Sequence, residues 1–157
     1  MRCEIKKIEM SKIFKDYKSY ALVTGAASGM GRIYVCRLAL MGYNVIMVDI
    51  NAKGLEETGR IVKEAVEAES KIDTSVKSRF DAVNLVQDLS QMDAADKIYE
   101  QTQAAGYQVE VLVNNAGIMY CQGIAETSER MLKIIMMVHM NTPWMLRRKY
   151  VTGMKER

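Results

Sequence analysis

Three glycines, Gly25, Gly29 and Gly31, follow a short apolar run in the stretch ALVTGAASGMG. The run from Tyr20 to Thr24 has the length and the composition of a buried strand. Glycine is needed where the backbone takes a positive φ, or where a ligand approaches the backbone closely. This turn therefore restricts the chain to folds in which a buried strand passes through a tight glycine-rich loop into a helix.

Apolar periodicity alternates between strand and helix along the rest of the chain. A helix is expected over 30–41, with Ile33, Cys36 and Leu40 on its apolar face and Gly42 as its stop. Further strands are predicted over 43–49, 81–88 and 109–117, and further helices over 51–70, 91–105 and 128–151. Strands that alternate with helices imply a parallel sheet with right-handed crossovers.

Length and composition fit one globular domain. The 157 residues are 49% apolar and 26% charged. We expect residues 1–17 to be an extension and residues 18–157 to be the domain. No apolar run reaches the roughly 18 residues of a membrane span, and the first residues lack the pattern of a secretory signal.

Charge and cysteine content narrow the expected partners and setting. A net charge of +3 is too small to indicate nucleic-acid binding, and we expect no membrane partner either. The three cysteines, Cys3, Cys36 and Cys121, have no paired spacing, which favours reduced thiols and a cytoplasmic setting. With one histidine and scattered cysteines, the sequence offers no metal site.

The first strand–helix turn of such a sheet is where a phosphate group binds, because a helix N-terminus offers free N–H groups and a positive dipole end. The alternative is a glycine-rich connection without a ligand. Asp49 ends the second strand, where an acid accepts hydrogen bonds from the adenosine ribose. A carboxylate repels a 2′-phosphate, and neither Ser28 nor Ile50 is basic, so we expect NAD rather than NADP. Alternatively, Asp49 caps the helix over 51–70.

These residues together resemble one family. The elements Thr24-Gly25-x-x-x-Gly29-x-Gly31, Asp49, Asp88-Leu89 and Asn114-Asn115-Ala116-Gly117 resemble the short-chain dehydrogenase/reductases over nearly all of residues 18–157. The resemblance implies an α/β fold with a Rossmann-type, doubly wound parallel sheet in strand order 3-2-1-4. It also implies NAD(P)-linked hydride transfer between an alcohol and a ketone.

The resemblance also assigns roles to residues of the cofactor site. Gly25, Ser28, Gly29, Met30 and Gly31 would hold the pyrophosphate. Asp49, with Ile50 beside it, would bind the adenine ribose. Asp88 would bind the adenine amino group with support from the Leu89 backbone, and Asp81 is the alternative adenine partner. Asn115, Ala116 and Gly117 would line the cofactor, while Asn114 would brace the fourth strand.

The catalytic residues that the family implies are a Tyr-x-x-x-Lys pair, a serine on a fifth strand and a relay asparagine. Tyrosine needs a neighbouring cation to act as a base, because its unperturbed pKa is about 10. Tyr150 is followed four residues later by Met154, and Lys155 lies one place too far. We therefore expect the chain to represent the cofactor-binding part, which does not catalyse the reaction alone.

The relay position falls on His139 or Asn141, and Pro143 follows closely. Proline lacks an N–H, so we expect the carbonyl of His139 to remain available to a water in a complete protein. The alternative is that His139 is a helix residue without a chemical role.

The methionine-rich helix over 128–151 should leave apolar surface exposed beside the fourth strand. The sequence therefore predicts self-association through this helix. Besides the dinucleotide, a small alcohol or ketone substrate is expected only in a complete protein. Two alternatives remain open: a stand-alone nucleotide-binding or interaction protein, and a nonfunctional gene fragment.

Overall fold

The computed structural model describes residues 19–72, 80–123 and 125–155. Four strands form one sheet in the order β3-β2-β1-β4, and every neighbouring pair is parallel. The strands are β1 (Ser19–Thr24), β2 (Asn44–Asp49), β3 (Ala82–Val86) and β4 (Gln108–Val113). The predicted α/β class and the predicted strand order are therefore confirmed.

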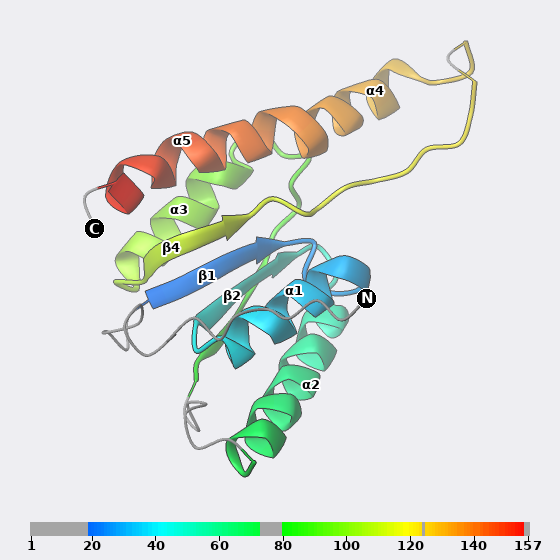
Figure 1. The fold of residues 1–157 in the computed structure, drawn as a ribbon. Coiled ribbons are helices and arrows are strands. Elements are labelled where there is room, and N and C mark those ends of the chain that lie inside the picture. Colours follow the sequence, from blue (N-terminus) through cyan, green and yellow to red (C-terminus); the bar gives the residue numbers. More distant parts are fainter. Residues whose placement is uncertain (1–18, 73–79, 124, 156–157) are drawn as a thin grey trace, which may run out of the picture.

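Helices cover both faces of the sheet (Figure 1). One face carries α1 (Gly29–Leu40) and α2 (Ala52–Ser70). The other carries α3 (Ala94–Ala104) and a long helical rod made of α4 (Glu129–Met136), η2 (Met137–Asn141) and α5 (Thr142–Lys155). Strands buried on both faces are apolar at successive positions, which explains why β1 and β2 were recognisable as continuous apolar runs.

Two apolar clusters form the core, one on each face of the sheet. On the α1–α2 side, Val23 and Met47 of the sheet belong to one cluster with Val35, Leu55 and Val62. On the opposite side, the second cluster joins sheet residues such as Leu22 and Ile46 to Ile98 of α3 and Leu146 of α5. The residues named here are fully buried, so the two helix layers are held to the sheet by apolar packing.

The predicted apolar face of α1 was wrong in one respect. Ile33 is 60% exposed, and the buried residues of α1 are Gly31, Val35 and Ala39. Small residues face the sheet because the helix begins close to the glycine loop, where a Cβ on Gly31 would overlap the Gly25 carbonyl. The predicted stop is confirmed, since Gly42 follows the helix with a φ of +94°.

The long helix is continuous but not uniform. Its middle segment, η2, is π-helical, and the Thr142 N–H donates to the carbonyl of Met137, five residues earlier. This wider turn comes just before Pro143, which has no N–H to complete an α-helical bond with the carbonyl of His139. The segment therefore accommodates the proline without a break in the helix.

The described residues also bear on the membrane, metal and cysteine predictions. Among them, no helix is long and apolar enough to span a bilayer. The same residues hold no group of three or more metal-ligating side chains. Cys36 and Cys121 are free thiols. Cys3 and the predicted extension over 1–17 lie outside the described residues.

Candidate functional site

A cavity of about 340 Å³ lies at the carboxyl ends of the four strands. Each strand contributes to it through residues at or just after its carboxyl end, and Ile134 and Val138 of the helical rod line one side. This edge of an open parallel sheet is where ligands of such folds bind. The lining residues are Gly25, Asp49, Ile50, Gln87, Asp88, Leu89, Ser90, Ala116, Gly117, Ile118, Ile134 and Val138.

The cavity brings together most of the residues predicted from the sequence. Those that line it are Gly25, Asp49, Ile50, Asp88, Leu89, Ala116 and Gly117. Ser28, Gly29 and Met30 are exposed at the beginning of α1, beside the cavity rather than within its lining. Gly31 is buried under Gly25, and Asn115 is turned towards β1.

The glycine loop needs its glycines for two different reasons. Gly25 and Gly29 have φ values of +68° and +53°, which side chains of L-residues rarely adopt. Gly31 instead lies too close to the Gly25 carbonyl to leave space for a Cβ. The loop leads directly into the first turn of α1, whose N–H groups and positive dipole end suit an anionic group such as a pyrophosphate.

Asp49 occupies the end of β2 and is tied to the backbone on two sides. Its Oδ2 accepts from the Ala27 N–H at 3.1 Å, and its Oδ1 accepts from the Asn51 N–H at 3.0 Å. The α2 helix is capped by Asn51, whose side chain accepts from the Gly54 N–H. Because Asn51 is the capping residue, the alternative role of Asp49 as the cap of α2 is wrong.

The two candidate acids for the adenine lie at opposite ends of β3. Asp88 lines the cavity, whereas Asp81 precedes β3 and accepts a 2.8 Å hydrogen bond from the Tyr20 hydroxyl. Burial, and then the Asp81 carboxylate, raise the pKa of Tyr20 well above its usual value. The alternative assignment to Asp81 is therefore wrong on geometric grounds, and the adenine role of Asp88 stays a prediction.

The Asp88 carboxylate is held by the turn that follows it. Ser90 donates from both its N–H and its hydroxyl to Oδ1, at 2.9 and 2.7 Å, and the Gln91 side chain donates to Oδ2 at 2.9 Å. The hydrogen bonds from Gln91 and Ser90 lower the pKa of Asp88, against a smaller opposing effect of burial. The acid is thus charged and fixed in orientation at the cavity.

Thr24 joins the glycine loop to the end of β4. Its hydroxyl oxygen accepts from the N–H groups of Asn115 and Ala116, both at 3.1 Å. The Asn115 side chain donates to the carbonyls of Thr24 and Gly25 at 3.0 and 3.3 Å. The sequence analysis named Thr24 only as part of the motif and did not predict this connecting role. A hydroxyl-bearing residue at the end of the strand could have indicated it.

The bracing role predicted for Asn114 was assigned to the wrong asparagine. Asn115 connects the end of β4 to β1, while Asn114 is exposed and donates to the carbonyl of Pro143 at 3.4 Å. Both residues follow the end of β4, where the chain turns and the Asn115 N–H donates back to the carbonyl of Val113. Asn115 faces the glycine loop, and Asn114 faces the helical rod.

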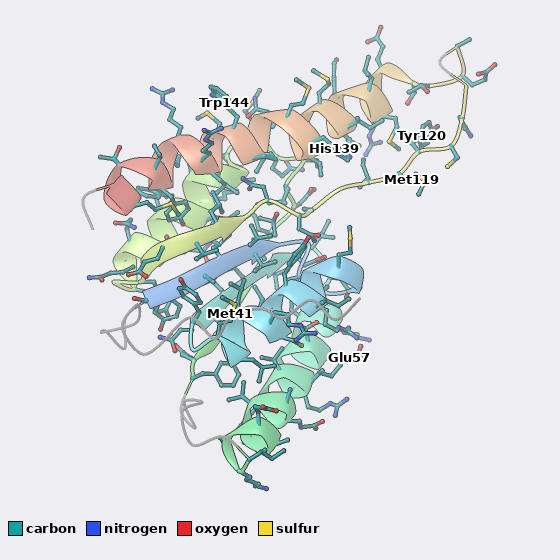
Figure 2. All side chains as sticks on the ribbon, viewed as in Figure 1. Met41, Glu57, Met119, Tyr120, His139 and Trp144 are labelled. Atoms are coloured by element: carbon teal, nitrogen blue, oxygen red, sulfur yellow. The ribbon has the colours of Figure 1, made fainter. Side chains whose placement is uncertain are left out.

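Of the two relay candidates, the structure brings only His139 to the site. Its Nε2 lies 3.0 Å from both the N–H nitrogen and the carbonyl oxygen of Ile118, so it accepts or donates according to its tautomer. A Cβ on Gly117 would lie 3.0 Å from the His139 ring. Figure 2 shows His139 between the helical rod and the segment that carries Met119 and Tyr120. Asn141 is exposed.

Tyr150 is a core residue rather than a site residue. It is 4% exposed, and its hydroxyl lies 2.6 Å from the Thr102 hydroxyl of α3. The Tyr99 ring packs edge-on against it, with the ring centroids 5.2 Å apart. Burial raises the pKa of Tyr150 to about 12. This position therefore does not supply the proton donor or acceptor that the family's chemistry needs.

Comparison with known proteins gives the same picture. Residues 19–157 match the family model described as short chain dehydrogenase. The chain is 27% identical over 135 residues to the bovine short-chain dehydrogenase/reductase family 16C member 6. It is 38% identical over 104 residues to the very-long-chain 3-oxoacyl-CoA reductase let-767 of Caenorhabditis elegans. The matches cover 86% and 65% of this chain but only 39% and 29% of those proteins.

Solved structures show the same fold. A metagenomic short-chain oxidoreductase in complex with NADP is similar with a TM-score of 0.74 and 25% identity, over 87% of this chain and 57% of that one. L-Sorbose reductase from Gluconobacter frateurii, complexed with NADPH and L-sorbose, is similar with a TM-score of 0.73 and 22% identity, over 88% and 48%. The family match, supported by this fold, shows that the chain belongs to the short-chain dehydrogenase/reductase family.

Proposed function

We propose that this chain is the dinucleotide-binding portion of an oxidoreductase that interconverts an alcohol and a ketone. The observation that carries the proposal is the cavity at the carboxyl ends of the strands, bordered by the glycine loop and by two fixed carboxylates, Asp49 and Asp88. The loop and the first turn of α1 offer backbone N–H groups to the pyrophosphate. Asp49 accepts from the adenosine ribose, and Asp88 accepts from the adenine amino group.

We further propose that the preferred cofactor is NAD. Asp49 is positioned to repel a 2′-phosphate, and its neighbour Ile50 is apolar and 65% exposed, so it offers no compensating charge. Ser28, on the loop, is also uncharged. The two similar structures described above are complexes with NADP and with NADPH. The preference of this chain therefore rests on its own acid at the end of β2.

When bound, the nicotinamide supplies the hydride acceptor or donor. The residues of this chain bind and orient it: Asn115 holds the end of β4 against β1, and His139 holds Ile118 from the opposite side. None of the eight tyrosines in the sequence is followed by lysine at the fourth position. We propose that the 157 residues bind the dinucleotide without catalysing hydride transfer by themselves.

Isothermal titration calorimetry with NAD and with NADP tests binding and cofactor preference together. The proposal expects saturable binding of NAD and weaker binding of NADP. Absence of heat with either dinucleotide would favour a fragment without function. A parallel assay of NADH formation from simple alcohols separates binding from catalysis, because any turnover by the purified chain would contradict its proposed inactivity.

We also propose self-association through the helix over 128–151. Leu132, Met136, Met140 and Trp144 recur every four residues along it and are between 46% and 67% exposed. Figure 2 shows Trp144 on the side of the rod that faces away from the sheet. Burial of such a stripe is favourable in water. Analytical ultracentrifugation should show oligomers that Trp144→Glu disperses, and a monomer at all concentrations would contradict the proposal.

A further inference from the structure

Arg32 is not part of the glycine motif that ends at Gly31, yet its side chain makes several contacts with the glycine loop and with α2. It lies one residue after the last glycine of the loop, on α1, and its side chain is 25% exposed. Its Nη2 donates to the carbonyl of Ala27 at 2.7 Å, and its Nε donates to the Thr58 hydroxyl at 3.0 Å. Arg32 therefore connects the outer part of the glycine loop to α2.

Thr58 completes this connection from the buried side. Its side chain is fully buried, and its hydroxyl donates towards the carbonyls of Ala26 and Ala27 at 3.0 and 3.3 Å. The same oxygen accepts from Arg32. Both carbonyls are thus turned towards α2, and each has a partner there. Loss of Arg32 or of Thr58 leaves one of these two carbonyls without its hydrogen bond. An unsatisfied buried carbonyl costs more than the hydrogen bond itself contributes.

The direction of these carbonyls determines where the next N–H groups point. In a trans peptide the C=O and the N–H lie on opposite sides of the bond, and the described residues contain no cis peptide. The Ala27 carbonyl faces Arg32 and also Thr58, which is on α2. The N–H of Ser28 therefore faces away from α2. The preceding peptide is fixed in the same way, with the Ala27 N–H bonded to Asp49.

We propose that Arg32 is a positioning residue for the pyrophosphate-binding loop, acting through Thr58 and the Ala27 carbonyl. This inference rests on the proposed dinucleotide function. Arg32 orients the loop so that the Ser28 N–H, which faces away from α2, is available to the phosphate groups of the ligand. The adenosine part of the ligand faces Asp49 and Asp88, with which Arg32 makes no direct hydrogen bond or ion pair.

Arg32 acts through hydrogen-bond geometry rather than through net charge. Glu57 on α2 pairs with its guanidinium, with Nη1 and Nη2 at 3.3 and 3.2 Å from the two carboxylate oxygens. Figure 2 shows Glu57 on α2 beside the beginning of α1. This pair neutralises the charge locally and fixes the planar guanidinium, and a lysine does not reproduce that fork of donors.

The matched control is Arg37 on the same helix. It is exposed, and its side chain makes no hydrogen bond or ion pair within the described residues. Arg37→Met removes the same charge and the same number of donors as Arg32→Met. Arg37→Met tests whether the loss of one positive charge from α1 is enough to weaken binding, and Arg32→Lys, which keeps the charge at position 32, tests whether the geometry of the donors matters.

The test compares ADP with adenosine as ligands of the 157-residue chain, by calorimetry or by chemical-shift titration. Arg32→Met should raise the dissociation constant for ADP about tenfold, the loss expected for one charge-assisted hydrogen bond, and leave that for adenosine unchanged. Arg32→Lys should recover only part of the loss, and Thr58→Val should repeat it. An equal loss for both ligands, or an equal loss in Arg37→Met, would overturn the proposal.

Amide hydrogen exchange at Ala27 and Ser28 separates this proposal from the proposed function. If the unaltered chain binds neither ADP nor NAD, the function fails, yet the exchange rates still report on the loop. Arg32→Met should then accelerate exchange at Ala27 while Arg37→Met leaves it unchanged. Unchanged exchange in Arg32→Met would show that Arg32 does not position the loop. If Arg32→Met does not fold, the same exchange measurement is made on the milder Arg32→Lys variant.

Discussion

The backbone N–H of Ala27 donates to Oδ2 of Asp49 at 3.1 Å, so the acid at the end of β2 also holds the glycine loop. The same carboxylate accepts from Asn51 through its other oxygen. A substitution of Asp49 therefore alters two properties at once: the charge that faces the ribose position, and the support of the loop. The two effects can be separated by the choice of the replacing residue.

Asp49→Asn should remove the repulsion of a 2′-phosphate while retaining one oxygen that accepts from the backbone. The ratio of NADP affinity to NAD affinity should rise about tenfold, equivalent to about 1.4 kcal/mol. Asp49→Ala should change the ratio similarly and also lower the melting temperature, because the Ala27 and Asn51 N–H groups lose their acceptor. Calorimetric titration of both variants checks this, and an unchanged ratio would exclude Asp49 as the source of the preference.

Gly31 and Gly29 should respond differently to substitution. Gly31→Ala places a Cβ against the Gly25 carbonyl, so the loop must shift, and we expect a loss of stability of about 2–3 kcal/mol together with a loss of NAD binding. Gly29→Ala has open space around its Cβ, and its φ of +53° should cost about 1–2 kcal/mol.

The larger Gly29→Val variant should abolish NAD binding, because its branched side chain would crowd the pyrophosphate. Denaturant unfolding and NAD titration measure the two effects. Equal unfolding free energies for Gly31→Ala and the unaltered chain would contradict the close packing at Gly25.

Much of this site could be predicted from the sequence because its residues directly follow strands. Asp49 and Asp88 occupy the carboxyl ends of β2 and β3, and the order of elements along the chain was enough to place them at one edge. Residues whose roles depend on how two helices meet could not be predicted. Arg32 and Thr58 are polar residues on helices, and only the packing of α1 against α2 brings them to the loop.

The errors have the same origin in tertiary packing. Ile33 fits an apolar helical face, but close approach of α1 to the glycine loop selects the face that carries Gly31 and Ala39. Asn114 and Asn115 are adjacent and are the same residue type. Only the direction of each side chain after the end of β4 distinguishes their roles.

Asp88 should make stability depend on pH at the acid end. Its folded-state pKa lies below the ordinary value, so its contribution is present above the unfolded pKa of about 4 and is lost as pH falls through the folded pKa. Unfolding free energies measured between pH 7 and pH 3 should fall less for Asp88→Asn than for the unaltered chain. Parallel curves for the two proteins would mean that the Ser90 and Gln91 hydrogen bonds do not favour the charged form.

Tyr150 should contribute to stability and not to ligand binding. Tyr150→Phe removes the hydrogen bond with Thr102 and should destabilise the chain by about 1 kcal/mol at neutral pH, with NAD affinity unchanged. Because the folded-state pKa is raised to about 12, the tyrosine's contribution is complete below its ordinary value of 10.0 and is lost as pH rises through 12. A weakened affinity for NAD in Tyr150→Phe would contradict its assignment to the core.

The most direct test of the account is a thermal-shift measurement on the 157-residue chain with NAD and with NADP. A ligand that binds only the folded state stabilises it by RT ln(1 + [L]/Kd), so the melting temperature rises with ligand concentration and rises more for the tighter ligand. The account predicts a concentration-dependent increase with NAD and a smaller one with NADP, both abolished in Gly29→Val. An equal increase with both would remove the role given to Asp49, and no increase with either would contradict the proposed dinucleotide site itself.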